Sequence, residues 1–242
     1  MKATLITLIA LAGVASAMTE KEAQDIISSA TIINNTYDFK DNQKNFTVIG
    51  VVDLDEYAVL RPTMSSTNRP VIMTFTDSKD NVLGAMFGDT GTWTTCLFNT
   101  YLNGKDRGSW AKIEGLGQSG ASAPDLYIGN AKSMAITLGY SGPDGSNQGT
   151  QLVFSYTDLE GTTKTAARND GGLRWRDNTL VSFELADAAK VFSKVYMIEG
   201  TKYVGEELAM LTKVATTPSV PEPTTGALSL LALAGLCIRR RK

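Results

Sequence analysis

The chain has 242 residues, with 23 Lys and Arg, 25 Asp and Glu, and no histidine. Without histidine, catalysis by Ser-His-Asp or Cys-His groups is excluded, and so are zinc sites with histidine ligands. The part between Met18 and Val220 holds 18 of the basic and 24 of the acidic side chains, a net charge of −6. This acidic balance argues against nucleic acid as a partner, because phosphates need a basic face.

The N-terminal segment has the order of a secretory signal peptide. Lys2 precedes an apolar run over residues 3–14, and the run ends in Ala15-Ser16-Ala17, whose small-x-small pattern suits a signal peptidase pocket. The apolar run is too short for a transmembrane helix. The sequence therefore predicts a signal peptide over residues 1–17 and an exported chain that begins at Met18.

A short helix and then a series of strands are expected next. Thr19 and Glu22 have the spacing of a capping box, and Ala23, Ile26 and Ile27 form one apolar face, which predicts a helix over residues 19–28. After it, the apolar period becomes that of strands. The predicted strands cover residues 46–52, 71–76, 82–87, 92–98, 126–128, 134–140, 152–156, 162–166, 180–185 and 191–198.

Turn-forming residues separate these strands. Asp77–Asn81 and Asp158–Gly161 read as hairpin loops, and longer loops are expected at residues 99–109, 115–124 and 142–147. Short strands at this spacing predict an all-β fold, an antiparallel β-sandwich, in one domain over residues 18–211. A closing helix is expected near residues 203–211, followed by a flexible linker over residues 212–220.

The C-terminal segment combines three parts. Pro221-Glu222-Pro223 is held extended by its prolines, and an apolar run follows over residues 226–238. The basic cluster that ends the chain cannot cross a membrane and would stay on its cytoplasmic side as a stop-transfer signal; it consists of Arg239, Arg240, Arg241 and Lys242. A permanent span needs roughly 20 residues, so this shorter run favours a hydrophobic helix that is processed.

This order of parts over residues 220–242 closely resembles the PEP-CTERM sorting signal of exported proteins of Gram-negative bacteria. The resemblance implies recognition by an exosortase-type sorting enzyme and removal of the hydrophobic helix after transient anchoring in the inner membrane. It also implies delivery to the cell surface, the outer membrane or the extracellular matrix. An ordinary single-pass anchor is the alternative, and it would keep the domain on the same side of the membrane.

Residues 46–211 resemble laminin-G and concanavalin A-like jelly rolls, through the strand Phe46–Val52, the hairpins, and the strand Phe192–Ile198 that leads into Gly205-Glu206-Glu207-Leu208. The resemblance implies a glycan-related role by analogy. Glucanases of this type carry Glu-x-Asp-x-Glu on one strand. Asp53-Leu54-Asp55-Glu56 lacks the first Glu, and adjacent side chains on a strand face opposite ways. We therefore expect a solvated strand end and no catalytic residue.

Calcium and glycans are the remaining ligands to consider. Asp77, Asp80 and Asn81, or Asp144 and Asn147, offer oxygen ligands for calcium, but turn formation explains both groups better, so no metal site is predicted. Glycans stack on exposed aromatic rings, and the candidates, which can equally be packing residues, are Trp175, Tyr101, Trp93 and Trp110.

Three functions stay open at this point. The first is a non-catalytic glycan-binding or adhesion module, and the second is a structural surface protein without a specific ligand. The third is a divergent glycoside hydrolase, against which the missing paired glutamates count.

Overall fold

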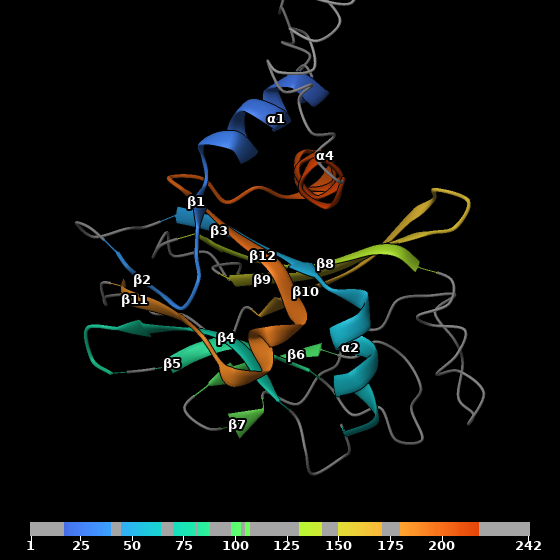
Figure 1. Cartoon of the computed structure of the whole chain (residues 1–242). Coiled ribbons are helices and arrows are strands. Elements are labelled where there is room, and N and C mark those ends of the chain that lie inside the picture. The colour runs from blue at the N-terminus through green and yellow to red at the C-terminus, as the bar shows by residue number, and fades with distance from the viewer. Residues whose placement is uncertain are drawn as a thin grey trace, which may run out of the picture.

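The computed structural model describes residues 17–39, 45–63, 70–80, 82–87, 98–102, 105–106, 131–141, 150–170 and 180–217. Within this part the strands form two six-stranded sheets, and every strand pairing is antiparallel. Figure 1 shows the sheets as stacked layers. The all-β fold class and the antiparallel sandwich predicted from the sequence are confirmed.

Sheet A has the strand order β1-β12-β3-β8-β9-β10. Its strands are β1 (Thr31–Ile32), β12 (Phe192–Glu199), β3 (Asn45–Val52), β8 (Ala131–Ser141), β9 (Thr150–Asp158) and β10 (Thr163–Asp170). Sheet B has the order β2-β11-β4-β5-β6-β7. Its strands are β2 (Thr36–Asp38), β11 (Leu180–Leu185), β4 (Val71–Asp77), β5 (Val82–Phe87), β6 (Phe98–Leu102) and β7 (Lys105–Asp106).

The main hydrophobic core lies between the two sheets. The alternation in β8 that predicted a strand places Met134, Ile136, Leu138 and Tyr140 on the inner face, and all four are buried. The ring of Phe46 lies 5.6 Å from the rings of both Phe75 and Tyr140, measured between centroids. Such aromatic pairs add about 0.5–1.5 kcal/mol each beyond the area they bury, so this cluster holds the sheets together.

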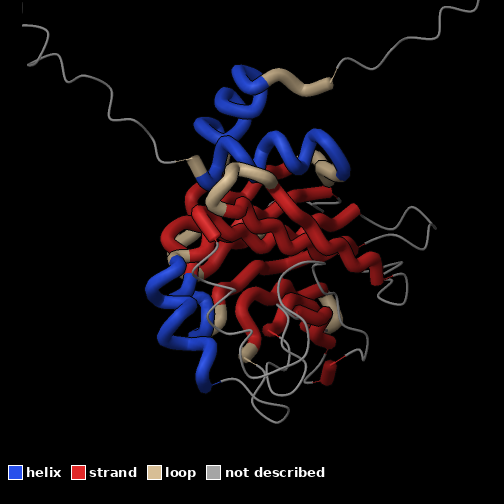
Figure 2. The backbone as a smooth tube through the Cα atoms, turned by 90° about the vertical axis from the view of Figure 1, so that its right-hand side faces the viewer, coloured by secondary structure: helices blue, strands red, loops and turns tan. Residues whose placement is uncertain are grey.

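Two helices cover the outer face of sheet A (Figures 1 and 2). They are α1 (Glu20–Ser29) and α4 (Gly205–Thr216), which lie against each other and over β12, β3 and β8. Between them and the sheet a second core is formed, by Ala23, Ile27, Ile49, Ala135, Tyr196, Ile198, Leu211 and Ala215. One end of this pair is fixed by an ion pair, in which Nζ of Lys213 lies 3.1 Å from Oε2 of Glu20.

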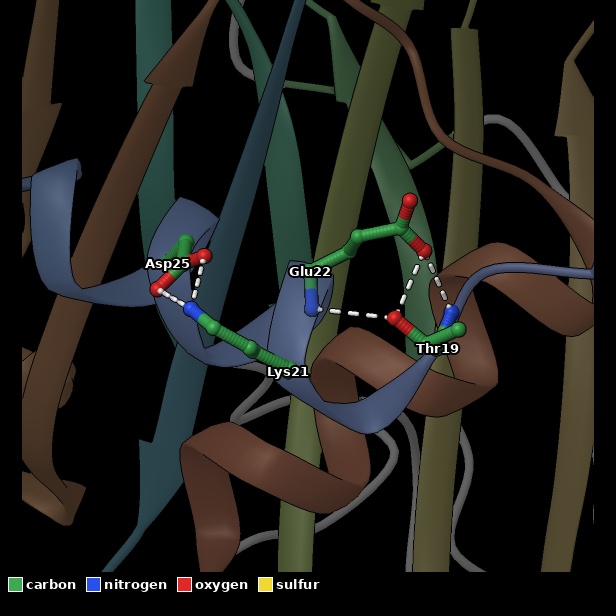
Figure 3. Close-up of polar contacts among 4 residues, drawn as sticks. All are labelled: Thr19, Lys21, Glu22 and Asp25. Atoms are coloured by element: carbon green, nitrogen blue, oxygen red, sulfur yellow. Dashed lines mark hydrogen bonds and ion pairs between the residues drawn. The ribbon is translucent and has the colours of Figure 1, made fainter.

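The capping box predicted for the first helix is confirmed (Figure 3). The backbone N–H of Glu22 donates to Oγ1 of Thr19 at 3.2 Å, and the backbone N–H of Thr19 donates to Oε2 of Glu22 at 2.7 Å. One turn along, Lys21 pairs with Asp25 at 2.7 Å. The two hydrogen bonds of the capping box give partners to the backbone N–H groups of Thr19 and Glu22, which have no intrahelical partners.

The closing helix is longer than predicted. α4 continues to Thr216, so the first five residues assigned to the linker 212–220 are helical. Leu211, Thr212 and Ala215 are buried against sheet A and α1, and this packing outweighs the low helix propensity of the neighbouring threonine and valine residues. The linker residues after Thr217, and the predicted segment 221–242, lie outside the described residues.

Several short elements were not expected. β1, β2 and the 3-10 helix η2 (Asp187–Val191) were missed, and β6 and β7 occupy most of residues 98–106, where a loop was predicted at 99–109. A helix, α2 (Leu54–Leu60), follows β3 and continues into the 3-10 helix η1 (Arg61–Thr63). The predicted strand 126–128, and 92–98 apart from Phe98, lie outside the described residues, as does the predicted signal peptide up to Ser16.

Candidate functional site

A groove of about 280 Å³ opens where the chain passes from sheet A to sheet B. On one side it is lined by the connection between β1 and β2, with Asn34 and Asn35, and on the other by η2 and the start of β12. The polar side chains that line it carry an amide, carboxylate, amine or hydroxyl group; they are Asn34, Asn35, Asp187, Lys190, Ser193 and Lys194.

Backbone hydrogen bonds fix both walls of the groove. The N–H of Ile33 donates to the carbonyl of Val195 at 2.9 Å in sheet A, and the N–H of Leu185 donates to the carbonyl of Asn35 at 2.8 Å in sheet B. Asn34 is therefore held between two strand pairings, one in each sheet. The backbone of this wall is therefore fixed before a ligand binds.

One aromatic residue, Phe192, completes the lining, and it also packs against the main core. Phe192 is half-buried at the start of β12, where its backbone N–H closes η2 on the carbonyl of Ala189. The ring lies over Gly50 of β3, because a Cβ atom at that position would fall 2.6 Å from the ring. Beside it, the hydroxyl of Ser193 donates to the carbonyl of Val51 at 3.3 Å, which leaves its oxygen free to accept.

The charged residues that line the groove have a positive net charge, whereas the part of the chain between Met18 and Val220 has a negative one. Among the described residues that line the groove, there are two lysines, Lys190 and Lys194, and one carboxylate, Asp187. Within the described part of the chain, neither lysine forms an ion pair within 4.0 Å. The groove can therefore present amine and amide donors together with carboxylate and carbonyl acceptors, next to an apolar ring.

The aromatic residues predicted as glycan ligands are not part of this groove as described. Trp93, Trp110 and Trp175 lie outside the described residues. Tyr101 lies in β6, where its backbone is paired with Gly84 of β5 and Asp106 of β7. The sorting residues Pro221, Glu222 and Pro223 and the basic cluster Arg239, Arg240, Arg241 and Lys242 also lie outside the described residues.

The acidic cluster at residues 53–56 follows the end of β3 at Val52, where a solvated strand end was predicted, and it also begins α2, which was not predicted. Oδ1 of Asp53 accepts hydrogen bonds from the backbone N–H groups of Asp55 at 3.0 Å and Glu56 at 3.2 Å. The side chain of Asp53 thus acts as the N-terminal cap. Asp55 and Glu56 are exposed in the first turn of the helix, where their charge is favourable.

The first calcium candidate forms a hairpin turn, which is the alternative favoured from the sequence. Oδ1 of Asp77 accepts from the backbone N–H of Lys79 at 2.9 Å, and Asp80 adopts a positive φ of 59° between β4 and β5. Asn81, Asp144 and Asn147 lie outside the described residues. Among the residues that the structure describes, no three acidic or cysteine side chains are grouped so that they could hold a metal ion.

Sequence reasoning missed the residues of the groove because they share no local signal. Asn34, Asp187 and Phe192 come together only through the pairing of β1 with β12 and of β2 with β11. The Asn34-Asn35 pair next to short apolar segments resembles an ordinary turn. No periodicity marks it as part of a site.

The chain was compared with solved structures, with curated proteins and with models of protein families. Among solved structures, the chain is similar to the metal-free form of lectin I-B4 from Griffonia simplicifolia, at 15% identity over 68% of this chain and 67% of that chain, with a TM-score of 0.24. No curated protein matches the chain. In the described part of the chain, no helix has the length and apolar character that crossing a membrane requires.

The family model that matches describes the PEP-CTERM protein-sorting motif, and it covers residues 219–242. This is the segment in which the sequence showed Pro221-Glu222-Pro223, the apolar run and the basic cluster. The motif implies export, direction to the cell surface and processing by an exosortase. The chain therefore carries a PEP-CTERM protein-sorting motif at its C-terminal end, as the sequence analysis predicted.

Proposed function

We propose that this protein is sorted to the cell surface, the outer membrane or the extracellular matrix, where its β-sandwich serves as a non-catalytic glycan-binding or adhesion module. In this proposal, the apolar C-terminal segment anchors the chain in the inner membrane only until the sorting enzyme has processed it. The sorting motif supports the destination, and the groove between the sheets supports the activity.

The observation that carries the binding function is the chemistry of the groove. Sugar hydroxyls both donate and accept hydrogen bonds, and amide and carboxylate groups such as those of Asn34, Asn35 and Asp187 can satisfy both roles. The ring of Phe192 offers an apolar surface for the C–H face of a sugar. At about 280 Å³, the groove is near the lower limit of roughly 300 Å³ for small-molecule sites, which suits one sugar unit.

The same site supports a role without catalysis. Glycoside hydrolysis uses two carboxyl groups, about 5–5.5 Å apart in retaining enzymes and about 6.5–9.5 Å apart in inverting ones. Asp187 is the one carboxylate among the described residues that line the groove. Asp53 is already engaged as a helix cap at the other acidic cluster. We expect no turnover of polysaccharides by the purified protein.

A glycan-array screen of the processed protein tests this function. Replacing Asp187 by Ala should weaken binding by tenfold or more, because a hydrogen bond to a charged group contributes about 1.5–3 kcal/mol. Asn34→Ala should weaken it less, and Asp25→Ala, on the exposed side of α1, is the matched control that should bind normally. Trp175→Ala tests the aromatic candidate from the sequence.

Three results would change the proposal. Loss of binding only in Trp175→Ala would move the site away from the groove. A folded protein that binds nothing on the array would favour a structural surface protein without a ligand. Hydrolysis of any arrayed glycan that is lost in Asp55→Asn or Glu56→Gln would favour the glycoside hydrolase.

A further inference from the structure

The last described helix ends almost at the sorting motif. The backbone N–H of Thr217 closes α4 on the carbonyls of Lys213 and Val214, at 3.1 and 3.2 Å, and the motif begins two residues later, at residue 219. An extended residue spans at most ~3.6 Å, so Pro221 lies within ~14 Å of Thr217 whatever conformation the chain takes between them.

That length is short compared with the domain. A compact domain of about 200 residues has a radius of gyration of ~16 Å. An enzyme that encloses Pro221-Glu222-Pro223 has at most ~14 Å of chain between its site and the end of the helix. The short connection brings the surface of the enzyme close to the surface of the domain around Thr217.

The part of the domain around Thr217 is a surface that carries charged and polar side chains from both helices. The ion pair between Lys213 and Glu20 joins the last turn of α4 to the first turn of α1, and both side chains are more than half exposed. Thr19 is exposed beside them and is held by the capping box shown in Figure 3. We call the exposed residues Thr19, Glu20, Lys213 and Thr217 the exit face.

The exit face is backed by packed side chains, so it keeps its shape. Ala23 of α1 and Leu211 of α4 are fully buried beneath it, and Ala215 is buried in the last turn. The hydroxyl of Thr217 donates to the carbonyl of Lys213 at 2.7 Å and adds a second closure to that turn. A partner that arrives at the motif meets a preformed surface there.

We propose that the exit face is the surface of this domain that the membrane-embedded exosortase-type enzyme contacts while it holds the sorting motif. The proposal rests on the processing that the motif implies, and it is independent of glycan binding. The enzyme thus recognises the motif together with the end of a folded domain.

The charges near the exit face favour a protein partner over the lipid surface. The charged residues of α1 are Glu20, Lys21, Glu22 and Asp25, and Lys213 completes the group. Two cations against three anions give no basic excess, whereas binding to anionic headgroups needs clusters of Lys and Arg. Lipid attraction alone would not hold this end of the domain at the membrane.

The proposal is tested by exchanging the charges of the ion pair on the exit face, with and without an inserted linker. The experiment uses the full chain in cells that produce and process it. The variant Glu20→Lys with Lys213→Glu keeps the ion pair and the net charge but reverses the pattern on the exit face. It is made at the native spacing and again with a 15-residue Gly/Ser linker inserted after Thr217. Such a linker has an end-to-end distance of about 20 Å, with a much longer maximum reach, and lets the domain stand clear of the enzyme.

We expect the swap to lower the rate of processing about threefold or more at the native spacing and to leave the rate unchanged with the linker. The rate is measured by following, in pulse-labelled cells, how fast the full-length chain is converted to the shorter processed chain. Thr217→Arg should behave in the same way. The matched control is Lys21→Asp with Asp25→Lys, which reverses the other ion pair of α1 and should be processed normally. A chain with Pro221→Ala and Pro223→Ala should not be processed at all, which separates loss of the motif from loss of the contact.

Equal slowing with and without the linker would show that the swap acts through folding, and would overturn the proposal. Normal processing of both the swap and Thr217→Arg at the native spacing would overturn it too. A control variant slowed as much as the swap would point to general electrostatics at the lipid surface instead. Thermal unfolding of each processed domain identifies variants whose fold is damaged.

Discussion

The two hydrophobic layers on either side of sheet A are built differently. The layer between the sheets contains large aromatic side chains that are fully buried, among them Phe46, Phe75 and Phe183. The outer layer, under α1 and α4, combines aliphatic side chains and one aromatic ring, Tyr196, with three alanines, Ala23, Ala135 and Ala215. Large side chains fill the space between two twisted sheets, whereas alanines allow helices to approach a sheet closely.

The layers also differ in how completely their polar groups are paired. In the outer layer, Oγ1 of Thr137 in β8 and Oγ1 of Thr212 in α4 are buried and have no hydrogen-bond partner among the described residues. An unpaired buried hydroxyl costs about 1–3 kcal/mol. The inner layer therefore fixes the sandwich, and the outer layer adds the helices with a smaller margin.

The strongest test of this difference removes an aromatic ring from the inner layer. Phe46→Ala should lower the free energy of unfolding by about 3–5 kcal/mol, because it leaves a cavity in contact with both sheets. Phe46 also contacts the rings of Phe39, Phe75 and Tyr140. Urea unfolding of the processed domain measures the decrease in the free energy of unfolding. A decrease below about 1 kcal/mol would show that the aromatic cluster does not hold the two sheets together.

The outer layer should respond less and more locally. Leu211→Ala is expected to cost about 2–3 kcal/mol, the low end of the range for such changes, because a helix on a surface can settle into the space. Amide exchange should speed up in both α1 and α4, since the helices share this core. If exchange in β4 and β11 of sheet B accelerates equally, the two layers are not separable.

Two threonines on the outer face of sheet A, Thr47 and Thr137, should respond to the same substitution with opposite changes in stability. The hydroxyl of Thr47 donates to the carbonyl of Thr201 and accepts from the N–H of Tyr203, both at 2.9 Å, whereas the hydroxyl of Thr137 has no partner in the part of the chain that the structure describes. Thr47→Val should destabilise the domain by about 1–3 kcal/mol, and Thr137→Val should stabilise it by about 1 kcal/mol. Melting temperatures that fall in both variants would mean that Thr137 is satisfied by bound water.

The smallest effect concerns the pH dependence of the outer layer. The hydrogen bonds that Thr19 donates from its backbone and its side chain lower the pKa of the Glu22 carboxyl below its ordinary value. A carboxyl whose pKa is lower in the folded state stabilises it above the unfolded pKa, and this contribution is lost as the pH falls through the folded pKa. Titration of Glu22 by NMR should show the lowered pKa, and Thr19→Ala should raise it only part of the way, because the variant loses the side-chain hydrogen bond but keeps the backbone N–H donor.

Much of the fold could be predicted because its signals are local. The capping box of Thr19 and Glu22 and the alternation from Met134 to Tyr140 each depend on residues within one element. The hairpin turn after Asp158 is also local, since its side chain accepts from the N–H of Thr162 at 2.7 Å and Gly161 has a positive φ of 90°. The sorting motif was predicted for the same reason, because it is read as a continuous segment.

The rest depends on contacts that no short segment contains. α2 was missed because its seven residues are too few for a clear helical period. Its apolar residues Leu54, Tyr57 and Leu60 are recognised as one face only because they pack against the core. The last turn of α4 was predicted as linker because its helical state depends on α1. The groove needs Asn34 and Phe192 to be brought together by both sheets.

The pairing of α1 with α4 sets the order in which the domain can be completed. Glu20 and Lys213 are 193 positions apart, so their contact closes a loop that contains nearly the whole domain. Closing a long loop in an unfolded chain costs more entropy than closing a short one, so contacts between such distant residues are expected to form after local ones. α1 can therefore pack against α4 only after α4 has been synthesised. The contact between the two helices forms once the residues just before the sorting motif have been made.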